Sequence, residues 1–297
     1  MWTVRSLQAW SLPWLQQKGI DTPRLDSDLL LADALGVERL ALFLDPNRPV
    51  VGEELARFKS HLQRRARREP VAYILGRRGF WQQEFTVTSA VLIPRPETEL
   101  LLETVLDHLP PLSVGDDTLQ ILELGVGSGA LLCSLLLSYP GARGVGVDLS
   151  AEALPVAEGN ARRLGCLART TLLAGDLWQP LSALSVGRFA VIVANPPYVT
   201  TAELAQLEPE VAVWEPRLAL DGGEDGLQVV RRIVQGAGSF LAPGGLLALE
   251  IGASQGDAVA ALLTEAGLQE VCLRLDYARQ PRVVMGRWPE VPEILVS

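Results

Sequence analysis

From about residue 117 onward, the chain alternates between short apolar runs and longer segments with a helical hydrophobic period. Apolar runs of this length, bounded by breaker residues, are typical of buried strands. The expected strands lie near 119–124, 144–148, 170–174, 189–194 and 245–251, and the expected helices near 129–139, 151–164, 225–240 and 256–266. This alternation predicts an α/β fold with a mostly parallel, doubly wound sheet. Two closely spaced runs, near 270–276 and 281–287, predict an antiparallel hairpin at the edge of that sheet.

The chain before this alternation has a different character. Residues 1–75 read as a small helical domain, in which Asp21-Thr22-Pro23 is a helix start signal. Residues 76–95 include an aromatic and β-branched stretch that predicts a β-hairpin linker. Pro94–Glu99 then begins a helix near 97–109. We therefore expect a helical domain over 1–75, a linker over 76–95 and the α/β domain over 96–297.

The charge balance limits the class of partner. The chain of 297 residues has a formal net charge of −9. Proteins that grip nucleic-acid phosphates usually carry a basic surface, so this balance disfavours a nucleic-acid-binding protein. The one basic cluster, Arg64–Arg68, ends a predicted helix. It is either a solvated helix end that complements the helix dipole or a patch for RNA or an acidic protein surface.

Metal and membrane sites find little support in the sequence. The only histidines are His61 and His108, and Cys133, Cys166 and Cys272 are far apart, which favours small buried hydrophobes over metal ligands. No apolar run reaches the roughly 18–20 residues of a membrane span, and no charged leader precedes an apolar segment. We expect a cytoplasmic protein in a reducing compartment, with no metal.

A glycine-rich turn follows the first predicted strand of the α/β domain. Ile121–Leu124 runs into Gly125-Val126-Gly127-Ser128-Gly129, after which a helix begins. Glycines permit a tight turn and a close approach of the backbone to a ligand, although such turns also occur without one. Glu123 strengthens the ligand interpretation, because a carboxylate at a strand end suits a ligand ammonium and is costly as an unpaired core residue.

Two further carboxylates follow at the next predicted strand ends. Asp148 comes 19 residues after Gly129, a spacing that fits an acid bound to ribose hydroxyls. Asp176 suits an adenine amino group, and Leu177 or Trp178 would pack on the ring. Three acids would repel a diphosphate but suit a ligand with a ribose, an adenine and an ammonium. The sequence therefore predicts a site for S-adenosylmethionine.

The strand near 189–194 ends at Asn195-Pro196-Pro197-Tyr198. In open α/β sheets the carboxyl edge of the strands is where ligands bind. Proline removes N–H donors, so this turn offers carbonyl acceptors, the amide of Asn195 and the flat ring of Tyr198. These groups suit a planar group that carries an NH2, either an amide or a nucleobase amine. A proline-rich turn without a ligand is the structural alternative.

Several segments together resemble the release-factor glutamine N5-methyltransferase family. They are Pro70–Gly76, Ile93–Glu99, Glu123–Gly129, Asn195–Tyr198, Trp214–Leu220 and Asp221–Leu227. The resemblance implies a helical N-terminal domain that docks the release factor, a β-hairpin linker and a seven-stranded, Rossmann-like class I methyltransferase domain. It also implies transfer of a methyl group from S-adenosylmethionine to the side-chain amide N5 of the glutamine in the Gly-Gly-Gln motif of peptide-chain release factors.

The same resemblance assigns roles to residues. Gly125, Val126, Gly127, Ser128, Gly129, Asp148 and Asn195 would contact the cofactor, joined by Glu123, Asp176 and Leu177 from the reasoning above. Asn195, Pro196, Pro197 and Tyr198 would hold the glutamine, with Asn195, Pro196 and Tyr198 as the catalytic set. Two residues depart from the family pattern. Val126 occupies a position where a small hydroxyl residue is common, and Leu177 occupies one where an aromatic residue can stack on the adenine.

Some roles and one other function stay open at this point. Glu97 and Thr98 would line the pocket or lock the helix onto the α/β domain, or else serve only as a helix cap. Arg217 would pair with an acid near the site or lie on the surface, and Gly222-Gly223 would serve loop geometry. The alternative function is an adenine-N6 or other amino methyltransferase acting on nucleic acid. The leading expectation is a monomer that modifies release factors and binds neither nucleic acid nor a membrane.

Overall fold

The computed structural model describes residues 1–109, 119–183 and 187–290, and these fall into two compact units. The first unit contains Met1–Arg77 together with Glu208–Trp214, and the second contains the rest of the described residues. The sequence assigned Glu208–Trp214 to the α/β domain, whereas the segment packs within the helical unit. Residues 291–297, which we included in the α/β domain, lie outside the described residues.

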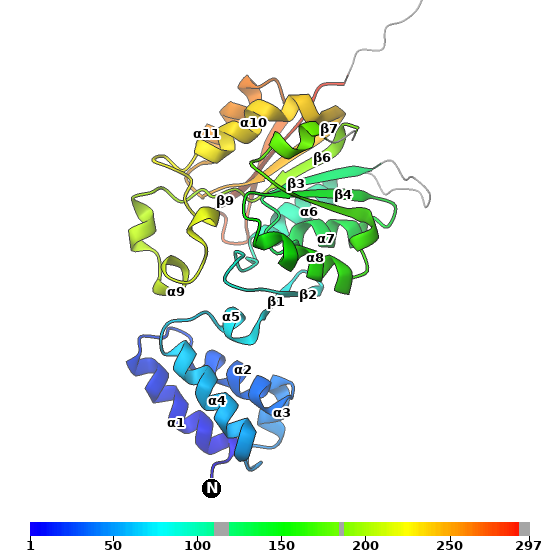
Figure 1. Cartoon of the computed structure of the whole chain (residues 1–297). Helices are drawn as coiled ribbons and strands as arrows, with labels where there is room; N and C mark the ends of the chain where they lie inside the picture. The colour runs from blue at the N-terminus through cyan, green and yellow to red at the C-terminus, as the bar shows by residue number, and fades with distance from the viewer. Residues whose placement is uncertain (110–118, 184–186, 291–297) are drawn as a thin grey trace, which may run out of the picture. The chain divides into compact units, whose positions relative to one another are not determined.

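The first unit is helical, as its amphipathic pattern predicts (Figure 1). Its helices are α1 (Val4–Gln17), α2 (Pro23–Leu35), α3 (Arg39–Leu44), α4 (Gly52–Arg65), α5 (Val71–Leu75) and α9 (Pro209–Ala212). The start signal of α2 is confirmed: Thr22 is the N-cap, Pro23 is the first helical residue, and Gly36 ends the helix in the left-handed conformation. Leucines and one phenylalanine of α1, α2 and α4 form a closed apolar core.

The basic cluster Arg64–Arg68 lies inside an ion-pair network of this unit. Arg65 is 5% exposed, and its guanidinium lies 2.6 Å from Asp26 and 2.7 Å from Glu210. Arg68 binds the other oxygen of Glu210, with a nitrogen–oxygen distance of 2.8 Å. The expectation of a solvated helix end is therefore wrong for Arg65, because carboxylates from α2 and from the returning segment surround its charge.

The second unit contains a small hairpin and a seven-stranded sheet with its helices. The hairpin strands are β1 (Arg77–Phe80) and β2 (Gln83–Thr86). The sheet strands are β3 (Gln120–Leu124), β4 (Arg143–Asp148), β5 (Thr170–Ala174), β6 (Phe189–Ala194), β7 (Leu241–Glu250), β8 (Gln269–Leu275) and β9 (Pro281–Arg287). The helices are α6 (Thr98–His108), α7 (Ala130–Ser138), α8 (Ala153–Arg163), α10 (Gln228–Phe240) and α11 (Gly256–Glu265). Short 3-10 turns occur at Leu167–Arg169, Gln179–Ala183, Glu203–Gln206 and Arg217–Ala219.

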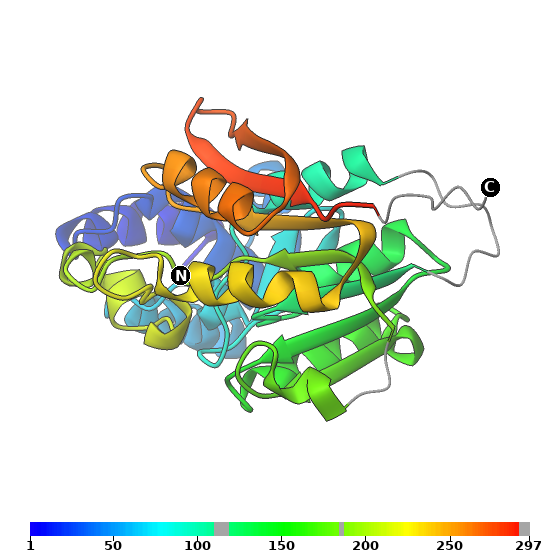
Figure 2. The same ribbon diagram turned by 90° about the horizontal axis from the view of Figure 1, so that it is seen from above.

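The strand order is β5-β4-β3-β6-β7-β9-β8. The five strands from β5 to β7 pair in parallel, and the order reverses between β3 and β6, where a doubly wound sheet opens a ligand-binding crevice. Strand β9 pairs antiparallel with both β7 and β8, so the last two strands form the expected edge hairpin, drawn in orange to red in Figure 2. The predicted α/β fold is confirmed.

Helices cover both faces of the sheet (Figure 1). Strand β6 illustrates the alternation, because Val191 and Val193 face the core built with α6, α7 and α8. Ile192 and Ala194 face the core built with α10 and α11. A strand buried on both faces reads as a continuous apolar run rather than an alternating one, as the sequence around residues 189–194 does.

The hairpin β1–β2 packs within the second unit rather than forming a separate linker. Asn160 of α8 receives a hydrogen bond from the backbone N–H of Thr86 (2.8 Å) and returns one to the Thr86 carbonyl (2.9 Å). Phe80 and Phe85 bury their rings in the core below α7 and α8. The segment that follows the hairpin is thereby held close to the carboxyl edge of the sheet.

The structure also bears on the cysteines and on the question of a membrane-spanning helix. Cys133 and Cys166 are buried thiols and Cys272 is half-buried, and all three are free. Within the described parts of the chain, no helix is long and apolar enough to cross a membrane.

Candidate active site

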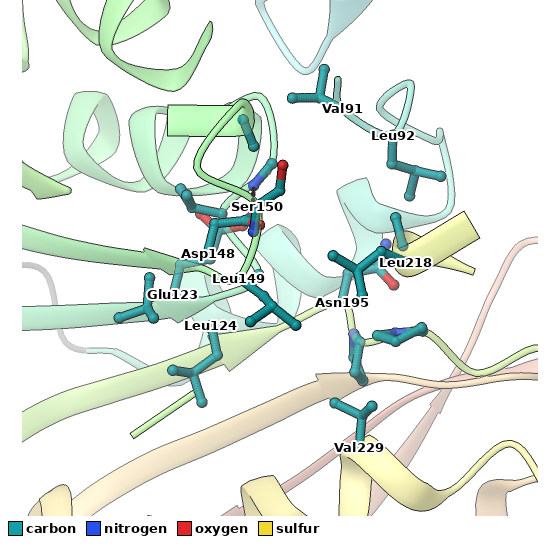
Figure 3. Close-up of a pocket in the computed structure, with 18 of the residues that line it drawn as sticks. Val91, Leu92, Glu123, Leu124, Asp148, Leu149, Ser150, Asn195, Leu218 and Val229 are labelled. Atoms are coloured by element: carbon teal, nitrogen blue, oxygen red, sulfur yellow. Dashed lines mark hydrogen bonds between the residues drawn. The ribbon is translucent and has the colours of Figure 1, made fainter. Parts of the chain in front are cut away.

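A cavity of about 340 Å³ lies at the carboxyl ends of β3, β4 and β6, within the size range of small-molecule sites (Figure 3). In Figure 3, Glu123 and Asp148 lie on one side of it and Asn195 and Leu218 on the other. The expected site residues that line it are Glu123, Gly125, Val126, Gly127, Ser128, Asp148, Asp176, Leu177, Asn195, Pro196 and Pro197. Gly129 and Tyr198 do not line it. The topology thus brings most of the expected residues to one place.

The glycine-rich turn is tied to the neighbouring strand by its backbone. The N–H groups of Gly125 and Val126 both donate to the carbonyl of Val147, at 2.8 and 3.0 Å. Gly127 has a φ of +50° and donates its N–H to Asp148 Oδ2 at 2.8 Å, a left-handed conformation that favours glycine. Gly129 is the N-cap of α7, and an added Cβ there would lie 3.3 Å from the Cβ of Ala157. Gly129 therefore allows close packing of α7 on α8 and does not line the cavity.

Glu123 is a buried carboxylate with a structural partner. Its Oε2 accepts a hydrogen bond from the backbone N–H of Leu132 in the first turn of α7, at 2.9 Å. Burial raises the pKa of Glu123 well above its usual range, and the hydrogen bond from Leu132 opposes that rise. The expected contact with a ligand ammonium is compatible with this arrangement, because a positive charge would offset the cost of ionising the buried carboxyl.

Asp148 binds the two backbone segments on either side of it. Its Oδ2 accepts from Gly127, and its Oδ1 accepts from the N–H of Ser150 at 2.9 Å. Burial raises the pKa of Asp148, and these two hydrogen bonds lower it. Each carboxylate oxygen has a second lone pair, so both can also accept from ligand hydroxyls.

After β5, the side chains of Leu177 and Trp178, the two candidates for packing on an adenine ring, point in different directions. Leu177 has a φ of +48° and lines the cavity. Trp178 turns away and stacks on Phe240, with ring centroids 4.9 Å apart, while its Nε1 donates to the Arg232 carbonyl at 3.0 Å. Asp176 lines the cavity and forms an ion pair of 2.7 Å with Arg232. Leu177 is therefore the side chain of this pair that can meet a bound ring.

The amide of Asn195 is hydrogen-bonded on one side only. Its Nδ2 donates to Thr98 Oγ1 at 3.1 Å, and Thr98 Oγ1 donates to Glu250 Oε2 at 2.6 Å. Among the described residues, no group donates to Asn195 Oδ1. Of the two residues left open at the start of α6, Thr98 is 7% exposed and lines the cavity, whereas Glu97 is exposed at the N-cap and makes no capping hydrogen bond through its side chain.

Tyr198 lies beside Glu250 and outside the cavity lining. Its hydroxyl donates to Glu250 Oε1 at 3.4 Å, and its carbonyl accepts from Gln255 Nε2 at 3.1 Å. Burial, followed by the charge of Glu250, raises the pKa of Tyr198 to about 12, so the hydroxyl keeps its proton at physiological pH. Because Tyr198 does not line the cavity, its stacking on a substrate stays a prediction.

Glycines after the motif allow a close approach to its backbone. An added Cβ at Gly222 would lie 2.7 Å from the Pro197 carbonyl oxygen, and one at Gly226 would lie 2.4 Å from that of Tyr198. This close approach at Gly222, and the φ of +89° at Gly223, agree with the loop-geometry role expected of Gly222-Gly223. Arg217 is exposed and pairs with Asp221 at 3.1 Å, so the acid expected beside it is present at the cavity rim.

A buried carboxylate that the sequence reasoning did not single out ties two motifs together. Glu215 is 5% exposed; its Oε1 lies 2.5 Å from the Arg95 guanidinium, and its Oε2 accepts from the N–H of Ile93 at 3.1 Å. Both partners belong to the Ile93–Glu99 segment that carried the family resemblance. Arg95 and Glu215 are charged residues within two of the segments that carried the family resemblance. Their presence there was the sequence signal from which this ion pair could have been expected.

Apolar side chains close the cavity from the segments that flank these motifs. Val91, Leu92, Leu218 and Val229 line it (Figure 3). Sequence reasoning missed them, because a single leucine or valine in a loop carries no pattern that distinguishes a ligand contact from packing.

Comparison with known proteins agrees with this geometry. Residues 7–76 match the family model described as "PrmC N-terminal domain", and residues 121–212 match "Methyltransferase domain". The chain is 44% identical over 286 residues to the release factor glutamine methyltransferase of Caulobacter vibrioides, covering 96% of each chain. It is 41% identical over 287 residues to that of Geobacter sulfurreducens, covering 97% of each.

Solved structures with lower identity share the fold. A methyltransferase from Pyrococcus furiosus has a TM-score of 0.52 at 15% identity, covering 76% of this chain and 98% of that one. The hMettl16 catalytic domain in complex with MAT2A 3′UTR hairpin 6 has a TM-score of 0.54 at 13% identity, covering 82% of this chain and 84% of that one. With full-length relatives above 40% identity and matches in both parts of the chain, this protein belongs to the release factor glutamine methyltransferase family.

Proposed function

We propose that this chain transfers a methyl group from S-adenosylmethionine to the side-chain amide of a glutamine in peptide-chain release factors, at N5 of the Gly-Gly-Gln glutamine. One observation carries the proposal. The amide of Asn195 is anchored through its nitrogen, so its oxygen is available beside a cavity that the glycine-rich turn also lines. Family membership supplies the class of acceptor.

The residues of the cavity fit the cofactor. S-adenosylmethionine, when bound, supplies an electrophilic methyl group on a sulfonium centre. Asp148 would accept hydrogen bonds from the ribose hydroxyls. Leu177 would pack on the adenine ring, and Asp176 would accept a hydrogen bond from the adenine amino group. Glu123 would lie nearest the amino-acid ammonium. The turn from Gly125 to Gly129 would let the backbone approach closely.

The acceptor amide would be held by oxygen atoms of the motif. An amide nitrogen is a poor nucleophile because its lone pair is delocalised into its carbonyl. Asn195 Oδ1 and the Pro196 carbonyl would each accept a hydrogen bond from one N–H of the glutamine side-chain amide. Pro197 and Tyr198 would complete the pocket for that amide. These acceptors orient the nitrogen and stabilise the positive charge that grows on it.

No dedicated base is required before methyl transfer. The alkylated nitrogen is acidic and loses its proton readily once the methyl group has moved. The chain's work is then orientation and charge complementarity, which agrees with the absence of a histidine from the cavity lining.

A protein acceptor also agrees with the charge of the chain. The net charge is −9, and the cationic side chains of Arg65 and Arg68 are paired with carboxylates rather than free to meet phosphates. We expect a monomer that acts on release factors without binding nucleic acid.

The test compares acceptors under tritiated S-adenosylmethionine. We expect label in a purified release factor, and none in the same factor when the glutamine of its Gly-Gly-Gln motif is replaced by Glu. DNA and ribosomal RNA form the second arm. Label in nucleic acid and none in protein would contradict the proposal and favour an amino methyltransferase of nucleic acid.

Two variants separate the roles inside the cavity. Asn195→Ala should lower turnover about 100-fold or more while the Kd for S-adenosylmethionine changes by less than about threefold, because the acceptor loses its orienting oxygen. Asp148→Asn should raise that Kd by about tenfold or more, because it replaces a carboxylate bound to two hydroxyls. Calorimetry measures the Kd of each variant. An unchanged turnover in Asn195→Ala would remove Asn195 from the mechanism.

A further inference from the structure

A chain of hydrogen bonds runs from the acceptor side of the cavity into the core. Asn195 Nδ2 donates to Thr98 Oγ1, and Thr98 Oγ1 donates to Glu250 Oε2 at 2.6 Å. Glu250 is fully buried and Thr98 is 7% exposed. The cavity is lined by Thr98 but not by Glu250. Among the described residues, the Glu250 carboxyl group is hydrogen-bonded to the Thr98 hydroxyl and to the Tyr198 hydroxyl, which lies 3.4 Å from its other oxygen.

The sheet brings these groups together. Strands β6 and β7 pair in parallel with Ala194 opposite Leu249, so Asn195, which follows β6, lies beside Glu250, the last residue of β7. The third member, Thr98, is the first helical residue of α6. The three residues come from distant parts of the chain and meet at the carboxyl edge of the sheet.

The chemistry of each group gives the chain one direction. The Thr98 hydroxyl donates to Glu250 Oε2, so its proton points to Glu250 and its oxygen is left as an acceptor. The hydroxyl oxygen then offers its lone pairs to Asn195, and only the NH2 end of that amide can donate to it. An asparagine amide can otherwise rotate by half a turn and exchange its oxygen for its NH2. In the rotated state it would present a donor to the donor N–H groups of the substrate.

We infer that Thr98 and Glu250 are positioning residues that hold the Asn195 amide with its oxygen toward the acceptor glutamine. This inference rests on the proposed function, because it concerns the orientation of the group that binds the glutamine. Thr98 acts on Asn195 directly, and Glu250 acts on it by orienting the Thr98 hydroxyl. Neither residue exchanges a proton with the substrate.

The experiment removes the hydroxyl without changing the shape of the side chain. Thr98→Val should lower kcat with a release factor by about 10- to 100-fold, because part of the population then presents the wrong end of the Asn195 amide. The Kd for S-adenosylmethionine should stay within about twofold, since Asn195 is one of many cofactor contacts. Thr98→Ser keeps the hydroxyl and should restore kcat to within about threefold of the wild type.

Thr104→Val is the matched control. Thr104 is a second buried threonine of α6, and its hydroxyl donates to the Leu100 carbonyl rather than to the network. The same substitution there should leave kcat unchanged, so that a loss in Thr98→Val cannot be attributed to packing of the helix.

A double-mutant cycle separates positioning from a general effect on structure. If Thr98 acts through Asn195, adding Thr98→Val to Asn195→Ala should cause no further loss of kcat. Glu250→Gln is the second variant. It should lower kcat several-fold, because the new NH2 group can donate to the Thr98 hydroxyl oxygen in place of the Asn195 NH2 group.

Full turnover in both Thr98→Val and Glu250→Gln would overturn the inference, as would a loss that adds to that of Asn195→Ala. The wild-type enzyme serves as the reference in every comparison. A wild type that does not label the release factor would instead refute the proposed function.

Discussion

Replacement of Glu250 by Gln should change how the stability of the sheet depends on pH. Glu250 ends β7, is fully buried, and has a pKa raised by burial from the ordinary 4.5 to about 7. The Thr98 hydrogen bond, the charge of Arg282 and the Tyr198 hydrogen bond oppose this rise, and the charge of Glu97 adds to it. Gln has the same shape and does not titrate, so the variant removes the pH dependence of this one group.

The sign follows from the direction of the shift. The folded protein holds the Glu250 proton more tightly than the unfolded chain does, so its contribution to stability is fully present below the unfolded pKa. That contribution is lost as the pH rises toward and through the folded pKa. The rise from 4.5 to about 7 corresponds to about 3 kcal/mol, because one pKa unit is worth about 1.36 kcal/mol. About 2–3 kcal/mol of this falls between pH 5 and pH 8, since the unfolded carboxyl is already partly ionised at pH 5.

The assay is urea unfolding followed by far-UV circular dichroism at several values between about pH 5 and about pH 8. The wild type should lose about 2–3 kcal/mol relative to Glu250→Gln across this range. Any pH-independent effect of the substitution cancels in that comparison. Glu265→Gln is the control, because Glu265 is exposed at the end of α11 and should leave the pH profile unchanged. A constant difference between the wild type and Glu250→Gln at every pH would refute the reasoning.

Two other substitutions test the packing. Gly226→Ala should destabilise the protein by about 2 kcal/mol or more, because φ is +72° and the new Cβ would lie 2.4 Å from the Tyr198 carbonyl oxygen. Gly159→Ala, with open space in the interior of α8, should stabilise it by about 0.5–1 kcal/mol, and thermal unfolding compares the two. Arg65→Ala should cost the helical unit about 3–5 kcal/mol by leaving the buried carboxylate of Asp26 without its arginine, whereas Arg48→Ala, at a partly exposed pair, should cost less than about 1 kcal/mol. Equal losses from the two arginine variants in urea unfolding would contradict the burial of Arg65.

The elements of the α/β unit were predictable because their signals are local. The apolar run 189–194 is followed by a proline pair, and both the strand β6 and its end were predicted from these residues alone. The same holds for the glycine-rich turn after β3, where the residues that permit the backbone conformation are themselves the signal. The antiparallel pairing of the last two strands followed from their short separation.

Other features depended on partners far away in the sequence. Nothing near Arg65 indicates that Glu210 will cover its charge, so a solvated helix end was a reasonable but wrong expectation. Trp178 points away from the cavity because its indole stacks on Phe240, whereas Leu177 lines the cavity. Packing of Leu177 on the adenine stays a prediction. A local pattern cannot contain such information, because the partner is placed by the packing of another helix.

The family, the α/β fold and the strand ends that carry the glycine-rich turn and Asn195–Tyr198 could be predicted from the sequence alone, since each has a contiguous pattern of residues. The hydrogen bonds around the Asn195 side chain depend instead on tertiary contacts. Thr98 and Glu250 are 152 residues apart, and they meet beside Asn195 because parallel pairing of β6 with β7 and the start of α6 bring three strand and helix ends to one point. Hydrogen-bond direction depends on which groups meet, and that is a property of the packed sheet rather than of any one segment.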